Sequence, residues 1–359
     1  MKFLIVKTSS LGDILHAFPF AQYLREKFPR ARIDWLVEKE GADLLKGFCC
    51  IDEVFCINTK LWKRSKWQKE TLREVYAFLG KIRKIEYDCI FDLQGNTKSG
   101  VLVFLAKGRC KVGFGRRSVS EYPNIFFTNK RYELPERKNI REDLLYLGRR
   151  HYGDFSSYES GRTLLKISQE EERLVSKLCK ELISSNSPSI MICPGSVWKN
   201  KQMSVSSWTL FLEELVSAMD CFFIFIWGTK EERNLASVLQ ENFSKNSFIL
   251  DRLRLPVLQR FMSRVDCIIS MDSLPLHLCG TVKTPSYSIF GPSSLKKYNP
   301  LGEIHGGFQA TCPYGEKFEK RCRFLRSCST GLCLKSLNVK EMLSSFKKWY
   351  ARRRFNSRI

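Results

Sequence analysis

The sequence lacks long apolar runs, and this absence limits the classes of protein to which it can belong. No stretch of about 18 apolar residues occurs, so we expect no transmembrane helix. The first residues lead directly into a core strand, without the apolar region and cleavage site of a secretory signal, so we expect none. With 43% hydrophobic and 27% charged residues, the composition is that of a folded globular protein.

Several short motifs with a defined chemistry are absent as well. No G-x-G-x-x-G follows the first strand of either half, which disfavours a nicotinamide enzyme. No D-x-D metal motif occurs at the candidate ligand-binding strand ends of either half, so we expect no metal and no further cofactor. Zinc-finger, RNA-recognition and helix-turn-helix signatures are missing too, which lowers the case for nucleic acid.

Acidic residues are few relative to basic ones, and the net charge is +23. Such an excess attracts polyanions, and we expect an anionic membrane surface or a phosphorylated glycolipid as the partner. A nucleic-acid-binding protein remains the alternative that charge alone suggests. We expect a monomer located in the cytoplasm.

Cysteines are numerous, but their contexts favour reduced thiols. Most of the fourteen lie in apolar, strand-like segments, as do Cys89, Cys193, Cys221 and Cys267. Reduced buried thiols are common in cytoplasmic proteins, whereas disulfide scaffolds are secreted. A second group lies near the C-terminus among cations: Cys312, Cys322, Cys328 and Cys333. Its spacings of ten, six and five residues do not fit the tight pairs of structural zinc sites.

Strand and helix patterns alternate twice along the chain. In the first half, strands are expected at 2–7, 32–37, 54–57, 88–93 and 111–114, and helices at 14–28, 40–47, 68–85 and 97–106. The pattern loosens over 130–162, and a helix follows near 168–185. In the second half, strands are expected at 189–193, 221–227, 248–250, 267–270 and 286–290, and helices at 205–219, 230–243, 255–264 and 274–281. Alternation of this kind predicts an α/β protein with two Rossmann-like domains, which bind ligands at the carboxyl ends of their strands.

The expected domain limits are 1–165 and 166–338, followed by a basic amphipathic helix at 339–359. Apolar residues of this last segment follow helical spacing, and cations gather late in it. It is either docked on the core or in contact with a membrane, and both can hold at once.

The opening segment, MKFLIVKTSSLGDILHAFP, has the pattern of a buried strand, a small-residue turn and a helix start. Such turns bind anions in α/β sheets, and the hydroxyl and N–H groups of Thr8, Ser9 and Ser10 suit that role. Gly12 allows a tight turn or a close approach of the ligand. Asp13 is then either a carboxylate at the mouth of the cleft or a helix cap.

This motif resembles the opening of the bacterial lipopolysaccharide heptosyltransferases, most closely those of the first kind. The family consists of GT-B glycosyltransferases that use ADP-heptose, with two Rossmann-like domains facing a central cleft. The resemblance implies that Asp13 is the general base that takes the proton of the acceptor hydroxyl.

Three further segments of the first half suggest an acceptor site. The segment 60–69 has five cations and two tryptophans, which suit phosphates, sugar acids or a membrane interface. D-x-Q-G at 92–95, followed by Lys98, resembles an acceptor motif of the family, although a plain turn and a surface lysine fit equally. At 113–121 the family's S-x-R-E has Ser120 in place of arginine. The expected acceptor residues are Ser9, Ser10, Gly12, Lys60, Lys63, Arg64, Gln94, Lys98, Arg116, Arg117 and Glu121.

The second half contains the motifs that suggest a donor site. Lys201 follows the strand end at Cys193–Ser196 and lies seven residues before Trp208. The family has the same lysine-to-tryptophan spacing, and its lysine binds the donor diphosphate; Lys199 is a competitor here. The segment Asp272-Ser273-Leu274-Pro275-Leu276-His277 resembles the family's D-[S/T]-G-x-x-H, with Leu274 in place of glycine. The expected donor residues are Ser196, Lys201, Glu231, Glu232, Asp272, Ser273 and His277, and the expected catalytic residues are Asp13 and Lys201.

The resemblance implies an inverting transfer of heptose from ADP-heptose to the Kdo-containing inner core of lipopolysaccharide. It also implies a peripheral location on the cytoplasmic face of the inner membrane. The cysteine-rich segment resembles members of the second kind, which leaves the first core heptose as an alternative acceptor. Ser120 and Leu274 leave a second alternative, a catalytically weakened member that binds glycolipid.

Overall fold

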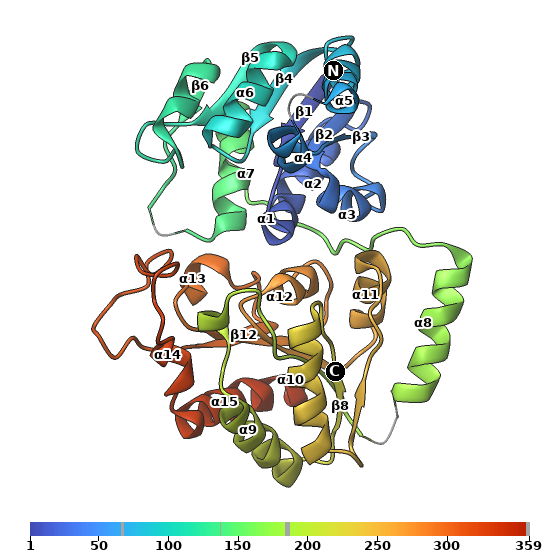
Figure 1. The fold of residues 1–359 in the computed structure, drawn as a ribbon, viewed down its shortest axis with the longest axis vertical. Coiled ribbons are helices and arrows are strands. Elements are labelled where there is room, and N and C mark those ends of the chain that lie inside the picture. Colours follow the sequence, from blue (N-terminus) through green and yellow to red (C-terminus); the bar gives the residue numbers. More distant parts are fainter. Residues whose placement is uncertain (66–67, 137, 184–186, 357–359) are drawn as a thin grey trace. The chain divides into compact units, whose positions relative to one another are not determined.

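Two parallel sheets organise the chain, one in each of two compact units, Met1–Lys166 and Ile167–Ile359 (Figure 1). The computed structural model describes residues 1–65, 68–136, 138–183 and 187–356. No helix in these ranges is long and apolar enough to cross a bilayer.

The first sheet has six parallel strands in the order β3-β2-β1-β4-β5-β6, the doubly wound order of a Rossmann-like domain. The strands are β1 (Lys2–Val6), β2 (Arg32–Glu38), β3 (Glu53–Ile57), β4 (Glu86–Asp92), β5 (Lys107–Phe114) and β6 (Lys130–Tyr132). The central strand β1 is apolar and almost fully buried, because helices cover both faces of a parallel sheet. The register sets Val6 beside Asp92, so β1 and β4 end together.

Helices cover both faces of this sheet. They are α1 (Leu11–His16), α2 (Phe18–Lys27), α3 (Ala42–Lys46), α4 (Thr59–Arg64), α5 (Lys69–Ile82), α6 (Thr97–Leu105) and α7 (Ile140–His151), with 3-10 turns η1 (Lys39–Gly41) and η2 (Tyr122–Phe127). Side chains of α5 and α6 share one apolar cluster with the sheet. On the opposite face α2 packs beside α7, where Phe20 of α2 contacts the ring of Phe91.

The loosened pattern expected over 130–162 is wrong, since this stretch contains β6 and α7. Gly148 suggested a break, but it lies inside α7. A Cβ at Gly148 would lie 2.6 Å from a ring carbon of Phe20, so the glycine serves close packing of α7 on α2. The first helix also begins at Leu11, earlier than expected, which places Gly12 within α1 and outside the turn.

The second sheet repeats the topology in the order β12-β11-β10-β7-β8-β9. Its strands are β7 (Ser189–Cys193), β8 (Phe222–Phe225), β9 (Ser247–Ile249), β10 (Cys267–Met271), β11 (Ser286–Phe290) and β12 (His305–Gln309). The strand β12 did not stand out in the sequence, because Gly306 and Gly307 weaken its pattern. A Cβ at Gly306 would lie 2.5 Å from the Trp349 ring, so a residue without a side chain fits beneath that tryptophan.

The helices of this unit are α8 (Gln169–Leu182), α9 (Val205–Ala218), α10 (Lys230–Asn242), α11 (Leu255–Met262), α12 (Leu274–Cys279), α13 (Leu295–Tyr298), α14 (Leu332–Lys335) and α15 (Val339–Asn356), with the 3-10 turn η3 (Lys199–Lys201). The terminal helix α15 packs on the core. Met342 and Phe346 are fully buried, and Phe346 lies edge-on to Phe211 and Tyr287. The apolar face of α15 is thus buried within its own unit.

Candidate active site

A half-buried carboxylate, Asp13, lies on α1 directly after the carboxyl end of β1. The Ser10 N–H and hydroxyl each donate to Asp13 Oδ2 at 3.0 Å, which fixes that oxygen. The other oxygen, Oδ1, lies 3.8 Å from His16 Nδ1, one turn along the helix. Asp13 therefore both closes the start of α1 and offers an oxygen near the strand end, so the two interpretations of its role are compatible.

The charge of Asp13 is fixed by its surroundings. Burial alone would raise the pKa of this carboxyl, but the His16 imidazole and the Lys7 ammonium lower it well below its usual range. Lys7 is buried and donates to the Leu93 carbonyl at 2.8 Å. Asp13 is consequently ionised throughout the neutral pH range. Sequence reasoning assigned no role to Lys7 or His16, although the three-residue spacing from Asp13 to His16 could have signalled the latter.

The end of β4 forms a rigid polar turn beside this position. Asp92 is fully buried and accepts from the N–H groups of Gln94 and Gly95 at 2.9 and 3.0 Å. It also accepts from the Ser99 hydroxyl at 2.9 Å and from the Asn124 amide at 2.6 Å. Burial raises the pKa of Asp92, although these donors oppose the shift. Asp92 thus holds the turn in shape and is not exposed to a ligand.

Two of the predicted acceptor residues lie on this turn and the helix that follows. Gln94 Oε1 is 3.4 Å from the Ser9 N–H, which links the ends of β1 and β4. Lys98, on the first turn of α6, donates to the buried Glu38 carboxylate at 2.9 Å. Glu38 also accepts from the Thr59 N–H at 3.1 Å. Glu38 is a site-forming residue that the sequence did not reveal, because it is the last residue of a strand with no motif around it.

Six further predicted acceptor residues lie at the surface. Glu121 accepts from Thr97, and these hydrogen bonds lower its pKa. Arg116 and Arg117 are exposed, and so are Lys60, Lys63 and Arg64. The Lys60 ammonium lies 2.9 Å from the Glu40 carboxylate oxygen Oε1.

The tryptophans of the basic segment cannot both be placed in a ligand site. The ring of Trp62 packs against Phe78, 5.7 Å between centroids, so it serves the core. The second tryptophan, Trp67, lies outside the described residues, as does Lys66.

A buried ionic cluster lies at the carboxyl end of β10 in the second unit. Lys201 Nζ is 2.5 Å from Asp272 Oδ2, and the Ser293 hydroxyl donates to the same oxygen. His277 Nε2 lies 3.5 Å from Asp272 Oδ1. Burial would raise the pKa of Asp272, but His277 and Lys201 hold it well below its usual range. The cluster brings together Lys201, Asp272 and His277, which were predicted as donor residues, and adds Ser293.

Other predicted donor residues surround neighbouring strand ends. Ser196 is buried, and its carbonyl accepts from the Gln202 amide at 2.5 Å. Glu232 caps α10, because it accepts from the N–H groups of Gly228 and Thr229 at 2.7 and 3.2 Å. Glu231 is exposed, and hydrogen bonds with its own N–H and with the Thr229 side chain lower its pKa. Ser273 lies at the start of α12, where its hydroxyl donates to the Met271 carbonyl at 3.4 Å.

The C-terminal cysteines are free thiols in this structure. Burial and the proximity of Cys312, Cys328 and Cys322 raise the pKa of Cys333 to about 11.

Comparison with known proteins identifies the family of this chain. The sequence profile described as glycosyltransferase family 9 (heptosyltransferase) matches residues 75–327, which is more than half of the chain. The chain belongs to glycosyltransferase family 9. It is therefore a glycosyltransferase of the heptosyltransferase family, as the N-terminal motif had suggested.

Individual members are distant in sequence. This family 9 member is 23% identical to lipopolysaccharide heptosyltransferase 1 of Pseudomonas aeruginosa over 357 residues, or 97% of each chain. Its fold is similar to that of the E. coli heptosyltransferase WaaC with ADP-2-deoxy-2-fluoro heptose, with a TM-score of 0.72 and 21% identity over 98% of this chain and 100% of the other. A family 9 glycosyltransferase from Veillonella parvula gives a TM-score of 0.77 at 16% identity, over 98% and 97%. The predicted α/β GT-B fold is thereby confirmed.

Proposed function

We propose that this family 9 glycosyltransferase moves heptose from ADP-heptose to the Kdo-containing inner core of lipopolysaccharide, with inversion at the anomeric carbon. The observation that carries the proposal is the ionised, half-buried Asp13 at the end of β1 in a chain of this family. Relatives named lipopolysaccharide heptosyltransferase 1, which match over up to 97% of their length, support the donor and the acceptor class.

In the proposed reaction the acceptor hydroxyl oxygen forms a bond to the anomeric carbon while the bond from that carbon to the ADP oxygen breaks. The hydroxyl proton passes to Asp13, and ADP leaves with the bonding electron pair. The lowered pKa of Asp13 keeps the carboxylate ionised, so it can accept the proton as the hydroxyl oxygen attacks.

Lys201 is proposed to stabilise the charge that develops on ADP. An ammonium has three N–H donors, and the contact with Asp272 uses one of them, so donors remain for diphosphate oxygens. Asp272, held by Lys201, Ser293 and His277, positions this ammonium, and we propose that it also binds hydroxyl groups of the donor heptose. Because Lys201 supplies the positive charge, we propose that turnover requires no divalent metal.

The roles proposed for other residues follow from exposure and charge. Gln94 and Lys98 border the turn beside Asp13 and bind the acceptor, together with Ser9 and Ser10. Glu231 is proposed to accept from ribose hydroxyls, since Glu232 is engaged in capping α10.

We further propose that the enzyme binds peripherally, as a monomer, to the cytoplasmic face of the inner membrane. Four apolar side chains on α6 and η2 are exposed by 42 to 76%: Val101, Phe104, Tyr122 and Phe126. The Lys111 ammonium lies 5.7 Å from the centre of the Phe104 ring, so cation and aromatic groups occur together there. Exposed apolar patches beside cations suit the surface of an anionic bilayer.

Co-sedimentation with vesicles tests the membrane contact. The variant Phe104→Ser with Phe126→Ser should bind phosphatidylglycerol vesicles more weakly than the parent, whereas Tyr76→Ser, which removes a 72% exposed ring from α5, should not change binding. Equal binding of all three proteins would contradict the contact.

The transfer itself is tested by ADP release from ADP-heptose with and without Kdo2-lipid A. We expect release that depends on the acceptor and is abolished by Asp13→Asn, which retains an oxygen for the Ser10 N–H. The matched control is Asp88→Asn, an exposed carboxylate of the same unit that accepts from one backbone N–H, that of Lys2.

The outcomes separate the remaining alternatives. Release only with an acceptor that already has its first heptose indicates an enzyme of the second kind. Binding of ADP-heptose without release on either acceptor indicates the weakened member that Leu274 and Ser120 suggested. Full turnover by Asp13→Asn refutes the proposed base.

A further inference from the structure

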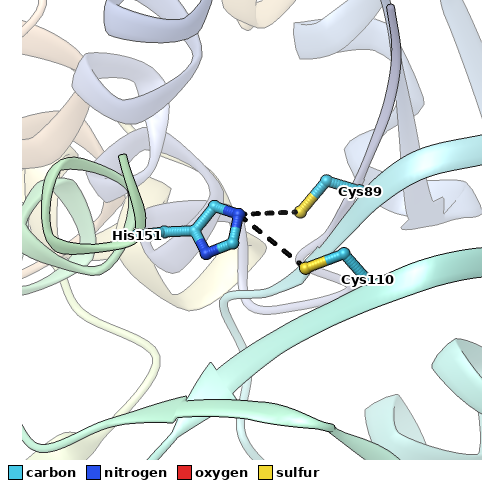
Figure 2. Close-up of side chains that lie close together, drawn as sticks. All are labelled: Cys89, Cys110 and His151. Atoms are coloured by element: carbon cyan, nitrogen blue, oxygen red, sulfur yellow. Dashed lines mark hydrogen bonds between the residues drawn. The ribbon is translucent and has the colours of Figure 1, made fainter. Parts of the chain in front are cut away.

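Three side chains with metal-binding chemistry meet on the sheet of the first unit: Cys89, Cys110 and His151 (Figure 2). Their ligand atoms lie within 4.8 Å of one another. His151 Nε2 is 3.8 Å from Cys89 Sγ and 3.7 Å from Cys110 Sγ. Figure 2 shows the ring nitrogen directed toward both sulfurs.

The fold itself brings these residues together. Cys89 of β4 pairs directly with Cys110 of β5 in the sheet register, so their side chains leave the same face side by side. His151 is the last residue of α7, which packs on this face beside β5 and β6. The residues are 21 and 41 positions apart and form no tight motif, so the sequence did not indicate the cluster.

The distances fit a tetrahedral metal centre. With zinc bonds of about 2.3 Å to sulfur and about 2.0 Å to nitrogen, a tetrahedron has sulfur-to-nitrogen edges of about 3.5 Å. The observed separations of 3.7 and 3.8 Å exceed this edge by about two or three tenths of an ångström. Thiolate and imidazole are also the ligand types that zinc prefers in proteins.

The second nitrogen of His151 is held in the way that metal-bound histidines usually are. His151 Nδ1 lies 3.1 Å from the Tyr132 hydroxyl, so an N–H at Nδ1 can donate to Tyr132 while Nε2 keeps its lone pair for a metal. The rings of Phe91 and Tyr152 pack edge-on against the imidazole and fix its orientation.

We propose that Cys89, Cys110 and His151 form a zinc site that joins the end of α7 to strands β4 and β5. Two thiolates balance the charge of Zn²⁺, which suits a site with one buried and two partly exposed ligands. The partial exposure of Cys110 and His151 leaves the fourth position to water. This site is separate from the proposed catalysis, because Cys89 precedes Asp92 by three residues, about 10 Å along the strand.

The test uses Co²⁺ as a spectroscopic substitute for Zn²⁺ on the full-length, metal-free, reduced protein. We expect one equivalent of Co²⁺ to bind with thiolate-to-cobalt transitions, to be displaced by Zn²⁺, and to release protons as the thiols ionise. In the zinc-loaded protein, X-ray absorption fine structure at the zinc edge should show two sulfur ligands and one nitrogen ligand from the protein.

Variants locate the metal. Cys110→Ser and His151→Gln, which alter partly exposed side chains, should lose the bound equivalent, and Tyr132→Phe should weaken binding about tenfold. Cys179→Ser, a partly exposed thiol of the second unit, is the matched control and should bind as the parent does. Circular dichroism verifies that each variant is folded.

Two results would overturn the proposal. One is that Cys110→Ser and His151→Gln both keep the cobalt spectrum and stoichiometry of the parent. If Cys328→Ser then loses the bound Co²⁺, the metal belongs to the C-terminal cysteines. The other is a reduced parent protein that binds no Co²⁺ through thiolate.

Discussion

Replacing Lys201 by methionine removes the ammonium that lies 2.5 Å from Asp272 but keeps much of the volume of the side chain. Asp272 is only 6% exposed, so water cannot take over the lost interaction. Removing one partner of a buried ion pair costs roughly 3–5 kcal/mol of unfolding free energy. Because Ser293 and His277 still face the carboxylate, we expect the lower end of that range, about 3 kcal/mol.

Neutralising the acid should recover part of this loss. In the Lys201→Met background, Asp272→Asn removes the buried charge, and we expect the two changes together to cost about 2 kcal/mol less than the sum of the single changes. Such coupling is the signature of a direct ionic contact.

Hydrogen exchange of peptides that cover β10 is the appropriate assay, because a chain with two compact units need not unfold in one step. Lys347→Met is the control, since Lys347 lies 3.7 Å from Glu214 and both are about half exposed; we expect a change of about 1 kcal/mol or less. Equal effects of the two lysine variants, or effects of Lys201→Met and Asp272→Asn that add within about 0.5 kcal/mol, would refute the reasoning.

Three further outcomes are expected. Gly148→Ala should lower the unfolding free energy by about 1–3 kcal/mol, because its Cβ would overlap the Phe20 ring of α2. Gly80→Ala, with open space around its Cβ, should raise the unfolding free energy by about 0.5–1 kcal/mol, and hydrogen exchange compares the two variants. Phe346→Ala should cost about 3–5 kcal/mol by the same measurement, because its ring is fully buried. The depressed pKa values of Asp13 and Asp272 stabilise the fold above the unfolded pKa of about 4 and lose this effect as the pH falls below it, so the difference in melting temperature between parent and Asp272→Asn should shrink below about pH 4.

The sequence predicted the main residues of the candidate active site, but not all of their partners. Short motifs marked Asp13, Lys201, Asp272 and His277, because each follows a buried strand within a few residues. Other partners of these groups were not marked, namely Lys7 and His16 beside Asp13 and Ser293 beside Asp272. Ser293 lies 21 residues from Asp272 and reaches it only because β10 and β11 are neighbours in the sheet.

The sequence by itself determined the alternation of strands and helices, the doubly wound class and the strand ends at which polar side chains gather, since these depend on local periodicity and on short turns. Only the tertiary structure decided that α7 packs on α2 at Gly148 and that Trp349 packs over Gly306 of β12. It alone also brought Cys89, Cys110 and His151 together. The physical reason is that such contacts join residues far apart in the chain, and their geometry depends on sheet register and on how closely two backbones approach.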